Sequence, residues 1–130
     1  MLNHAPVLVV EDETFIALDL AFAIEDAGGE VVGPVSSVKA ALALLEKRPV
    51  AAAILDVNLT DQDISPVVDI LSGLGVPIIV QTGVGLPPGL LARFPNLVVW
   101  IKPYLAELLV SQLATLIANN CAVTELSGEN

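Results

Sequence analysis

Five polar side chains of this sequence stand at or just beyond the ends of short apolar runs. They are three carboxylates, one hydroxyl and one ammonium, which belong to Glu11, Asp12, Asp56, Thr82 and Lys102. Carboxylates that lie close together repel one another, so they need protons or a cation. Mg²⁺ suits such oxygen ligands and implies phosphate chemistry, because it neutralises phosphoryl oxygens. Asp56 could then be the nucleophile that forms an aspartyl phosphate, with Lys102 and Thr82 contacting the other phosphoryl oxygens.

Apolar runs typical of buried strands alternate with helical periodicity along the whole chain. The predicted strands cover 7–10, 30–35, 52–56, 77–80 and 97–101, and a helical stretch follows each of them, although only a short helix fits within 86–94. This alternation predicts a parallel sheet with crossover helices on both faces. The fold is therefore predicted to be a doubly wound α/β domain, and the chain is short for six strands, which favours the flavodoxin-like order 2-1-3-4-5.

Capping residues and polar segments give the expected boundaries. Ser37 is predicted to cap the second helix, and Ser65 the third, with Pro66 at its first helical position. An amphipathic pattern from Tyr104 predicts the last helix. The polar residues that follow are predicted to be a flexible tail, which divides the chain into a domain over 1–118 and a tail over 119–130.

Composition excludes several other classes of protein. The chain has 130 residues, which suits one domain, and its net charge of −10 argues against nucleic acid binding. Cys121 is the single cysteine, so neither an internal disulfide nor a thiolate metal cluster is expected. No apolar run approaches the ~20 residues that span a membrane, and the N-terminus does not resemble a signal peptide. The expected location is the cytoplasm.

The order and spacing of four segments resemble those of response-regulator receiver domains. The segments are Val9-Val10-Glu11-Asp12-Glu13, Ile54-Leu55-Asp56-Val57-Asn58-Leu59, Thr82-Gly83 and Lys102-Pro103, and the resemblance covers about residues 6–118. The resemblance implies that Asp56 is the phosphoacceptor and that Asp12 binds Mg²⁺ directly. Glu11 would hold the ion through water, and the backbone carbonyl of Asn58 would be the third protein ligand. Mn²⁺ could substitute for Mg²⁺.

The same resemblance implies roles for the residues after the fourth and fifth strands. Thr82 and Lys102 would take the switch and phosphate-pairing roles, and Pro103 completes the usual Lys-Pro peptide. Gly83 stands where the family needs a small residue to admit the phosphodonor. Many receivers carry Phe or Tyr three residues before the lysine, but this chain has Val99 there and Trp100 next to it. The aromatic switch of the family is therefore expected to be missing or replaced.

A finer resemblance concerns a subfamily of short receivers. The Thr-Gly pair and the abbreviated fourth helix are similar to receivers with a Phe-Ala-Thr-Gly motif, which are often paired with HWE/HisKA2 kinases. Only the Thr-Gly part of that motif is present. The expected function is a single-domain response regulator that accepts phosphate from a histidine kinase or phosphotransfer protein and switches binding to a downstream protein.

Alternatives remain open at this point. The chain could be a receiver-like interaction module without phosphorylation, or a phosphatase with an aspartyl nucleophile, although Asn58 stands where such enzymes need a second carboxylate as general acid. We expect a switch rather than a turnover enzyme. Each site residue also has a structural interpretation, as a helix start, a cap, a turn or a solvated lysine. The apolar content suggests a homodimer through the fourth and fifth elements, but core burial accounts for the same composition.

Overall fold

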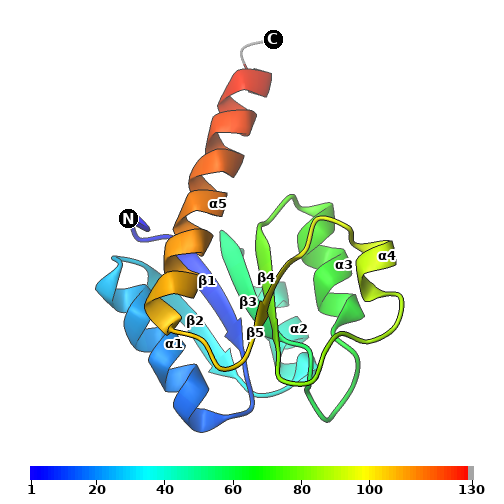
Figure 1. Ribbon diagram of the computed structural model, residues 1–130. Coiled ribbons are helices and arrows are strands. Elements are labelled where there is room, and N and C mark those ends of the chain that lie inside the picture. Colours follow the sequence, from blue (N-terminus) through cyan, green and yellow to red (C-terminus); the bar gives the residue numbers. More distant parts are fainter. Residues whose placement is uncertain (129–130) are drawn as a thin grey trace.

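Ten elements alternate along the chain (Figure 1). The structure is a computed structural model that describes residues 1–128, and it describes the side chains of residues 1–120. The strands are β1 (Pro6–Val10), β2 (Glu30–Val35), β3 (Ala52–Asp56), β4 (Ile78–Thr82) and β5 (Val98–Ile101). The helices are α1 (Thr14–Asp26), α2 (Val38–Lys47), α3 (Ser65–Gly73), α4 (Leu90–Arg93) and α5 (Ala106–Gly128).

The five strands form one parallel sheet in the order β2-β1-β3-β4-β5, which confirms the predicted topology. Every residue of β3 and β4 is buried, as expected for central strands covered on both faces. Strand β2, which contains Gly33 and Pro34, lies at one edge, where an interrupted ladder is tolerated. Because all strands are parallel, the carboxyl ends of β1, β3, β4 and β5 lie at the same end of the sheet.

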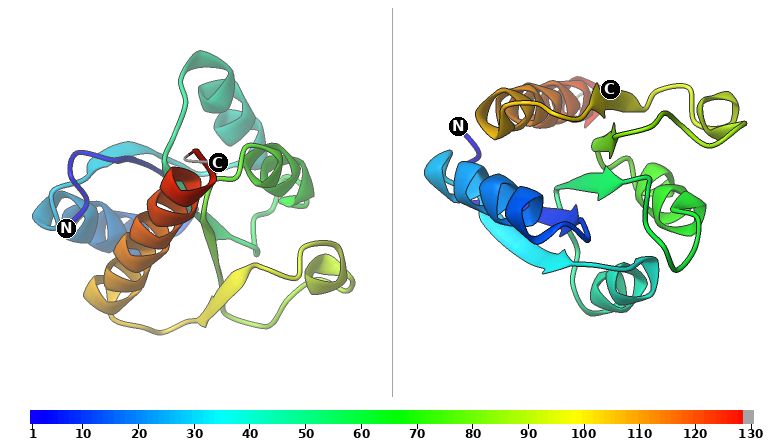
Figure 2. Two further views of the ribbon diagram at one scale, coloured as in Figure 1. Left: turned by 90° about the horizontal axis from the view of Figure 1, so that it is seen from above. Right: turned by 60° about the horizontal axis from the view of Figure 1, so that its bottom comes forward.

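Two hydrophobic clusters cover the two faces of the sheet. One cluster joins alternate strand residues to α1 and α5, and the other joins the remaining strand residues to α2, α3 and α4. Figure 2 shows α1 and α5 on one side of the sheet and α2 and α3 on the other. Period-two alternation of the strands explains this division, because Ile54 faces the α1–α5 side and Leu55 faces the α2–α4 side.

Of the two helix caps predicted from the sequence, one is confirmed and the other is wrong. The Ser37 side chain accepts a hydrogen bond of 3.1 Å from the Ala40 amide, so the predicted cap of α2 is confirmed. Ser65 was predicted to cap α3, but it is the first residue of that helix. The carboxylate of Asp63 accepts hydrogen bonds from both the amide and the hydroxyl of Ser65. A carboxylate is the stronger acceptor at a helix start, which explains the exchange of roles.

Helix α5 is longer than the sequence analysis predicted. It continues to Gly128, whereas 119–130 was predicted to be a tail. No glycine or proline interrupts the sequence between Tyr104 and Leu126, so nothing in the local sequence ends the helix earlier. Residues 129–130 lie outside the described part of the chain, and the division at residue 118 stays a prediction. Within residues 1–128, no helix has the length and hydropathy needed to cross a bilayer.

Candidate functional site

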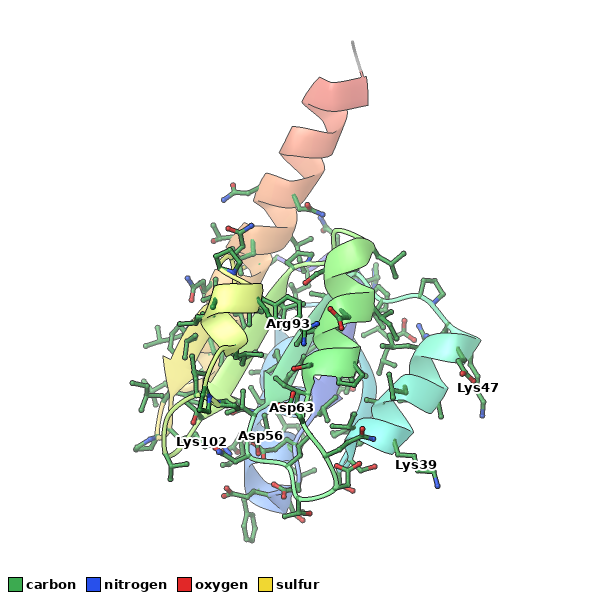
Figure 3. The ribbon with its side chains drawn as sticks, turned by 90° about the vertical axis from the view of Figure 1, so that its right-hand side faces the viewer. Lys39, Lys47, Asp56, Asp63, Arg93 and Lys102 are labelled. Atoms are coloured by element: carbon green, nitrogen blue, oxygen red, sulfur yellow. The ribbon has the colours of Figure 1, made fainter. Side chains whose placement is uncertain are left out.

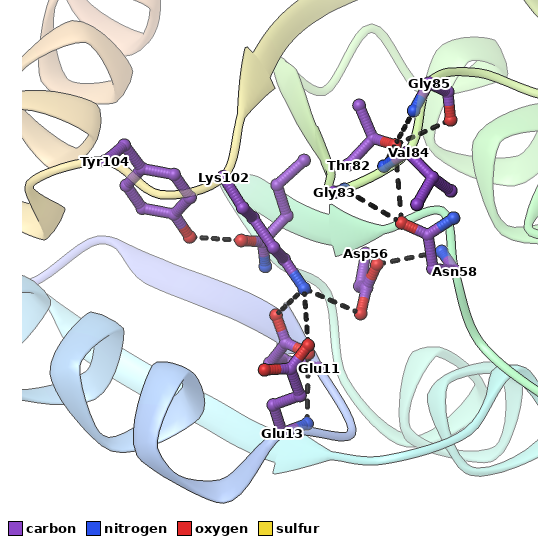
Figure 4. A network of polar contacts seen from close by, with 11 residues as sticks. Glu11, Glu13, Asp56, Asn58, Thr82, Gly83, Val84, Gly85, Lys102 and Tyr104 are labelled. Atoms are coloured by element: carbon purple, nitrogen blue, oxygen red, sulfur yellow. Dashed lines mark hydrogen bonds and ion pairs between the residues drawn. The ribbon is translucent and has the colours of Figure 1, made fainter.

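The carboxyl ends of β1, β3 and β5 bring two acidic side chains and one lysine together (Figure 4). The ammonium of Lys102 lies 3.2 Å from Asp56 Oδ2 and 3.1 Å from Glu11 Oε1. It also lies 3.3 Å from Glu13 Oε1, which comes from the start of α1. Asp56 is 1% exposed and Glu11 is 3% exposed, so these are buried charges that need partners. The predicted convergence of Glu11, Asp56 and Lys102 is confirmed.

Asp56 owes its place to the sheet itself. It is the last residue of β3 and pairs with Gln81 in the ladder to β4. The next backbone amide, that of Val57, donates to the Gln81 carbonyl at 3.0 Å. The Asn58 amide turns back and donates to Asp56 Oδ1 at 2.8 Å. One carboxylate oxygen is thus bound by the loop, and the other faces Lys102.

Lys102 is fixed at its backbone as well as at its ammonium. Its amide donates to the Thr82 carbonyl at 2.8 Å, which places it directly beyond β5. Burial by itself lowers the pKa of Lys102, but the hydrogen bonds and charges of Glu11 and Asp56 outweigh burial and raise that pKa above its ordinary value. The ammonium is therefore a permanent positive charge beside Asp56.

Of the two buried carboxylates, Glu11 is the one whose negative charge is less fully compensated. Its Oε2 accepts from the Glu13 amide at 3.0 Å. Its Oε1 is within ion-pair distance of Lys102 but accepts no hydrogen bond. Burial, and then the neighbouring Asp56 carboxyl group, raise the pKa of Glu11 to about 7, against the lowering effects of the Glu13 amide and Lys102. The ammonium of Lys102 is shared by Glu11, Glu13 and Asp56, so part of the negative charge of these carboxylates stays uncompensated.

The acidic residues fit a divalent cation. Carboxylate oxygens of Glu11, Asp12 and Asp56 all lie within 4.8 Å of one another. The buried Glu11 Oε1 without a hydrogen bond and the exposed Asp12 at the mouth of the cluster offer oxygen donors of the kind that Mg²⁺ and Mn²⁺ prefer. The role predicted for the backbone carbonyl of Asn58 stays a prediction.

Thr82 is next to the cluster but its hydroxyl is engaged elsewhere. The hydroxyl donates to the Gly85 carbonyl at 2.6 Å and accepts from the Gly85 amide at 2.8 Å and the Val84 amide at 3.2 Å. The side-chain oxygen of Asn58 accepts from the Gly83 amide at 3.0 Å and lies 3.3 Å from the Thr82 hydroxyl. Thr82 would have to leave this turn before it could contact a phosphoryl group on Asp56.

Gly83 and Pro103 both border Lys102, and the roles predicted for them stay predictions. A Cβ added at Gly83 would meet only the Lys102 side chain, at 4.0 Å, so the position borders the lysine without being closely packed. Pro103 follows Lys102 through a cis peptide bond. Figure 3 shows Asp56 and Lys102 side by side, whereas Lys39, Lys47 and Arg93 lie elsewhere on the molecule.

The sequence analysis missed one polar contact beside the site. Gln81, near the carboxyl end of β4 and fully buried, accepts a hydrogen bond from the Tyr104 hydroxyl, while its Nε2 has no partner. Burial, and then the negative charges of Glu11 and Asp56, raise the pKa of Tyr104 above its ordinary value. Trp100 packs edge-on against Tyr104 with ring centroids 5.9 Å apart. A glutamine inside an otherwise apolar strand was the available signal, because such residues are rarely buried without a partner.

Comparisons with known proteins add a further finding. No protein-family model matches the chain, and no curated protein sequence does. Among solved structures, it is similar to SdrG from Sphingomonas melonis Fr1, with 33% identity, a TM-score of 0.74 and coverage of 90% of this chain and 99% of that one. It is also similar to a response regulator from Chloroflexus aurantiacus, with 26% identity, a TM-score of 0.73 and coverage of 88% and 98%. A response regulator receiver protein from Sinorhizobium medicae shares the fold at 21% identity, with a TM-score of 0.78 and coverage of 92% and 99%.

Proposed function

Because the chain belongs to the family of response regulator receiver domains, we propose that it accepts a phosphoryl group on Asp56 and thereby switches its binding to a partner protein. The observation that carries the proposal is the contact of the Lys102 ammonium with Asp56 Oδ2, at 3.2 Å, inside a buried group of carboxylates. Packing of the core does not require a lysine held against an aspartate by the ends of separate strands. Phosphoryl transfer to that aspartate does require such a positive charge beside it.

In the proposed transfer, Asp56, Lys102 and Thr82 each have a separate role. A carboxylate oxygen of Asp56 forms a bond to phosphorus as the bond between phosphorus and the donor nitrogen breaks, and the donor imidazole leaves. Lys102 is already charged and in place to neutralise the phosphoryl oxygens. The Thr82 hydroxyl exchanges its bond to Gly85 for one to a phosphoryl oxygen, which moves the segment after β4.

Glu11, Asp12 and Asp56 would hold Mg²⁺, with Mn²⁺ as a substitute, and the Asn58 carbonyl would complete the protein ligands. When bound, the ion supplies positive charge that neutralises phosphoryl oxygens during transfer. Glu11 would be ionised by the ion and would no longer be a buried carboxylate with an uncompensated oxygen.

The donor we propose is a sensor histidine kinase or a phosphotransfer protein, and the chain acts as a switch in the cytoplasm rather than as a turnover enzyme. Hydrolysis of the acyl phosphate by water would reset it. The finer proposal is a short receiver paired with HWE/HisKA2 kinases. It is supported by Thr82-Gly83 and by the single-turn α4, which has 4 residues.

The test is phosphorylation of the full chain with acetyl phosphate and Mg²⁺, followed by intact-protein mass spectrometry. We expect one added phosphoryl group, its loss in Asp56→Asn, and no labelling when EDTA removes the metal. Asp63→Asn is the matched control, because Asp63 is an exposed carboxylate in the loop after β3, and this variant should be labelled like the wild type.

Two outcomes would contradict the proposal. A wild-type chain that acquires no phosphoryl group from acetyl phosphate or from any histidine kinase of its own cell would be the unphosphorylated interaction module. Labelling of Asp56→Asn at the wild-type level would place the acceptor elsewhere. Sustained release of phosphate from a generic phosphomonoester would instead support a phosphatase.

A further inference from the structure

The loop that follows β3 is held by side chains rather than by its backbone. Residues 58–63 lie between the buried Val57 and the buried Ile64, and of these only Leu59 packs against a hydrophobic cluster. Within residues 1–128, no hydrogen bond from backbone to backbone joins residues 58–63 to any other part of the chain. A loop with so few packing and backbone contacts opens easily, so its conformation depends on the polar side chains that anchor it.

Asp61 anchors this loop to the start of α2. Its two carboxylate oxygens accept hydrogen bonds from the amides of Val38, at 3.1 Å, and Lys39, at 3.2 Å. The Ser37 hydroxyl accepts from the next amide, that of Ala40. Each of the first three amides of α2 thus has a side-chain acceptor, and two of them depend on a residue that is 22 or 23 positions away in the chain.

The charge of Asp61 suits this place. A carboxylate at the start of a helix faces the positive end of the helix dipole. Desolvation by itself would raise the pKa of Asp61, but the hydrogen bonds from the amides of Val38 and Lys39 outweigh it and lower that pKa below its ordinary value. Helices that follow parallel strands begin where the strands end, and Figure 3 shows Lys39 at the same end of the molecule as Asp56. The anchor and the phosphoacceptor therefore share one end of the sheet.

Asn58 connects the anchored loop to the phosphoacceptor site. Its amide donates to Asp56 Oδ1 at 2.8 Å, and its side-chain oxygen accepts from the Gly83 amide at 3.0 Å. It precedes Asp61 by only three positions, so the chain between them is short. The position of Asn58 is therefore set by the end of β3 on one side and by the contact of Asp61 with α2 on the other.

We propose that Asp61 is a positioning residue of the phosphoacceptor site: by binding the start of α2, it holds the loop after β3 with Asn58 in place for the divalent cation. The part that concerns the cation rests on the proposed function, whereas the anchoring of Asn58 does not. Asp61 is not among the carboxylates grouped around Asp56, and it acts through Asn58. Because coupling between two contacts is reciprocal, a bound cation must in turn strengthen the contact of Asp61 with α2.

The anchor is tested first in the metal-free chain, by hydrogen exchange of backbone amides measured by NMR. Asp61→Ala should speed the exchange of both the Val38 and the Asn58 amides by about fivefold, as expected for the loss of a helix cap. Asp61→Asn keeps one acceptor oxygen without the charge and should have a smaller effect on both. Ser37→Ala is the matched control, because it removes the other side-chain cap of α2 and should leave the Asn58 amide unchanged.

The effect on the cation is tested by titrating the same variants with Mg²⁺ and following the amide chemical shifts of the loop after β3. Asp61→Ala should weaken Mg²⁺ binding by about threefold to fivefold, whereas Ser37→Ala should bind like the wild type. In the wild type, Mg²⁺ should slow the exchange of the Val38 amide by the same factor, and in Asp61→Ala it should not. A residue that only stabilised α2 would produce neither result.

Labelling with acetyl phosphate separates binding of the metal from the transfer itself. At Mg²⁺ concentrations below half-saturation of the wild type, Asp61→Ala should be labelled about threefold to fivefold more slowly. At saturating Mg²⁺ the two rates should become equal, because Asp61 touches none of the reacting atoms. A rate that stays low at saturating Mg²⁺ would contradict a role in positioning the metal site alone.

Each failure has a distinct interpretation. Faster exchange at Val38 with unchanged exchange at Asn58 would make Asp61 a helix cap only, and equal weakening of Mg²⁺ binding by Ser37→Ala would assign the effect to the stability of α2. Either result overturns the proposal. A wild type that is labelled, together with unweakened Mg²⁺ binding in Asp61→Ala, refutes the part that concerns the cation and leaves the proposed function intact. A wild type that neither binds Mg²⁺ nor becomes labelled defeats the proposed function, while the exchange rates still decide whether Asp61 anchors Asn58.

Discussion

The two faces of the sheet differ in what they hold at the carboxyl ends of the strands. On the α2–α4 side, strand residues such as Val80 and Val99 pack in a cluster that is aliphatic apart from Phe94. On the α1–α5 side, Trp100 and Tyr104 join the cluster, and alternation puts Gln81 on the same side as Ile79. Apart from Thr82, the aromatic and polar side chains of the last two strands and of the segment after β5 are therefore concentrated on the α1–α5 face.

This difference bears on how the phosphorylation proposed for Asp56 would be read out. An aromatic residue at position 99 would lie on the same face as Val80 and, by alternation, Thr82, but this chain has valine there. The hydrogen bond from Tyr104 to Gln81 lies on the opposite face, the one covered by α1 and α5.

The largest expected effect tests whether both faces are equally well packed. Leu55→Ala on the α2–α4 side should lower the free energy of unfolding by about 2–5 kcal/mol, because it leaves a cavity in a fully buried position. Ile54→Ala, its neighbour on the α1–α5 side, should cost a similar amount in urea denaturation. A much smaller cost for Ile54→Ala would mean that the face with polar groups is loosely packed.

Next in size is the cost of breaking the polar contact on the α1–α5 side. Tyr104→Phe should lower the free energy of unfolding by about 1–2 kcal/mol, since it leaves the buried Gln81 amide without any partner. Adding Gln81→Met to Tyr104→Phe should recover most of the loss, because the unpaired amide is then gone. Additive losses in the urea titrations of the two variants would show that this hydrogen bond is not formed.

A smaller effect compares the helix starts on the two faces. Ser37→Ala should destabilise the chain by about 1 kcal/mol, because its hydroxyl oxygen caps α2. Glu13 is the corresponding residue of α1 and makes no capping hydrogen bond with its side chain. Glu13→Ala removes an ion pair with Lys102, but the Glu13 side chain is 62% exposed, so solvent screens that pair. The urea midpoint should therefore stay nearly unchanged, and a loss as large as that of Ser37→Ala would contradict the assigned geometry.

The smallest effect concerns the ion pair between Arg93 and Asp69 on the α2–α4 side. The two side chains are 57% and 53% exposed, so solvent screens their contact of 3.0 Å. Arg93→Gln should shift the free energy of unfolding by less than about 0.5 kcal/mol. Thermal unfolding at low and high salt is the measurement, and a strong salt dependence lost in the variant would show that the pair matters more.

The sequence was sufficient for the fold and for the gathering of Glu11, Asp56 and Lys102, and the reason is the same for both. Parallel strands with buried runs have only one edge where their carboxyl ends meet, so residues that follow them must converge. The cap of α3 by Asp63 and the engagement of the Thr82 hydroxyl could not be predicted, because each depends on which of several nearby polar groups wins a local competition.

The Gln81–Tyr104 contact could not be predicted from the sequence for a different reason. The two residues are 23 positions apart, and their meeting depends on the pairing of β4 with β5 and on the direction of the chain after Pro103. The extent of α5 beyond Asn119 could not be predicted, because polar residues at the end of a chain are typical of a tail. The metal ligands, the phosphoacceptor role, the homodimer and the subfamily stay predictions.

The single turn of α4 has a consequence for exchange of backbone hydrogens with solvent. The Arg93 amide donates to the Gly89 carbonyl and the Phe94 amide to the Leu90 carbonyl, in a turn that starts at Gly89 in the left-handed region with φ of 81°. One turn cannot sustain itself by helix propagation and depends on the anchoring of Leu90, which is 3% exposed. We therefore expect these amides to exchange through local opening, orders of magnitude faster than those of β3 and β4, which would let this segment change shape without disturbing the sheet.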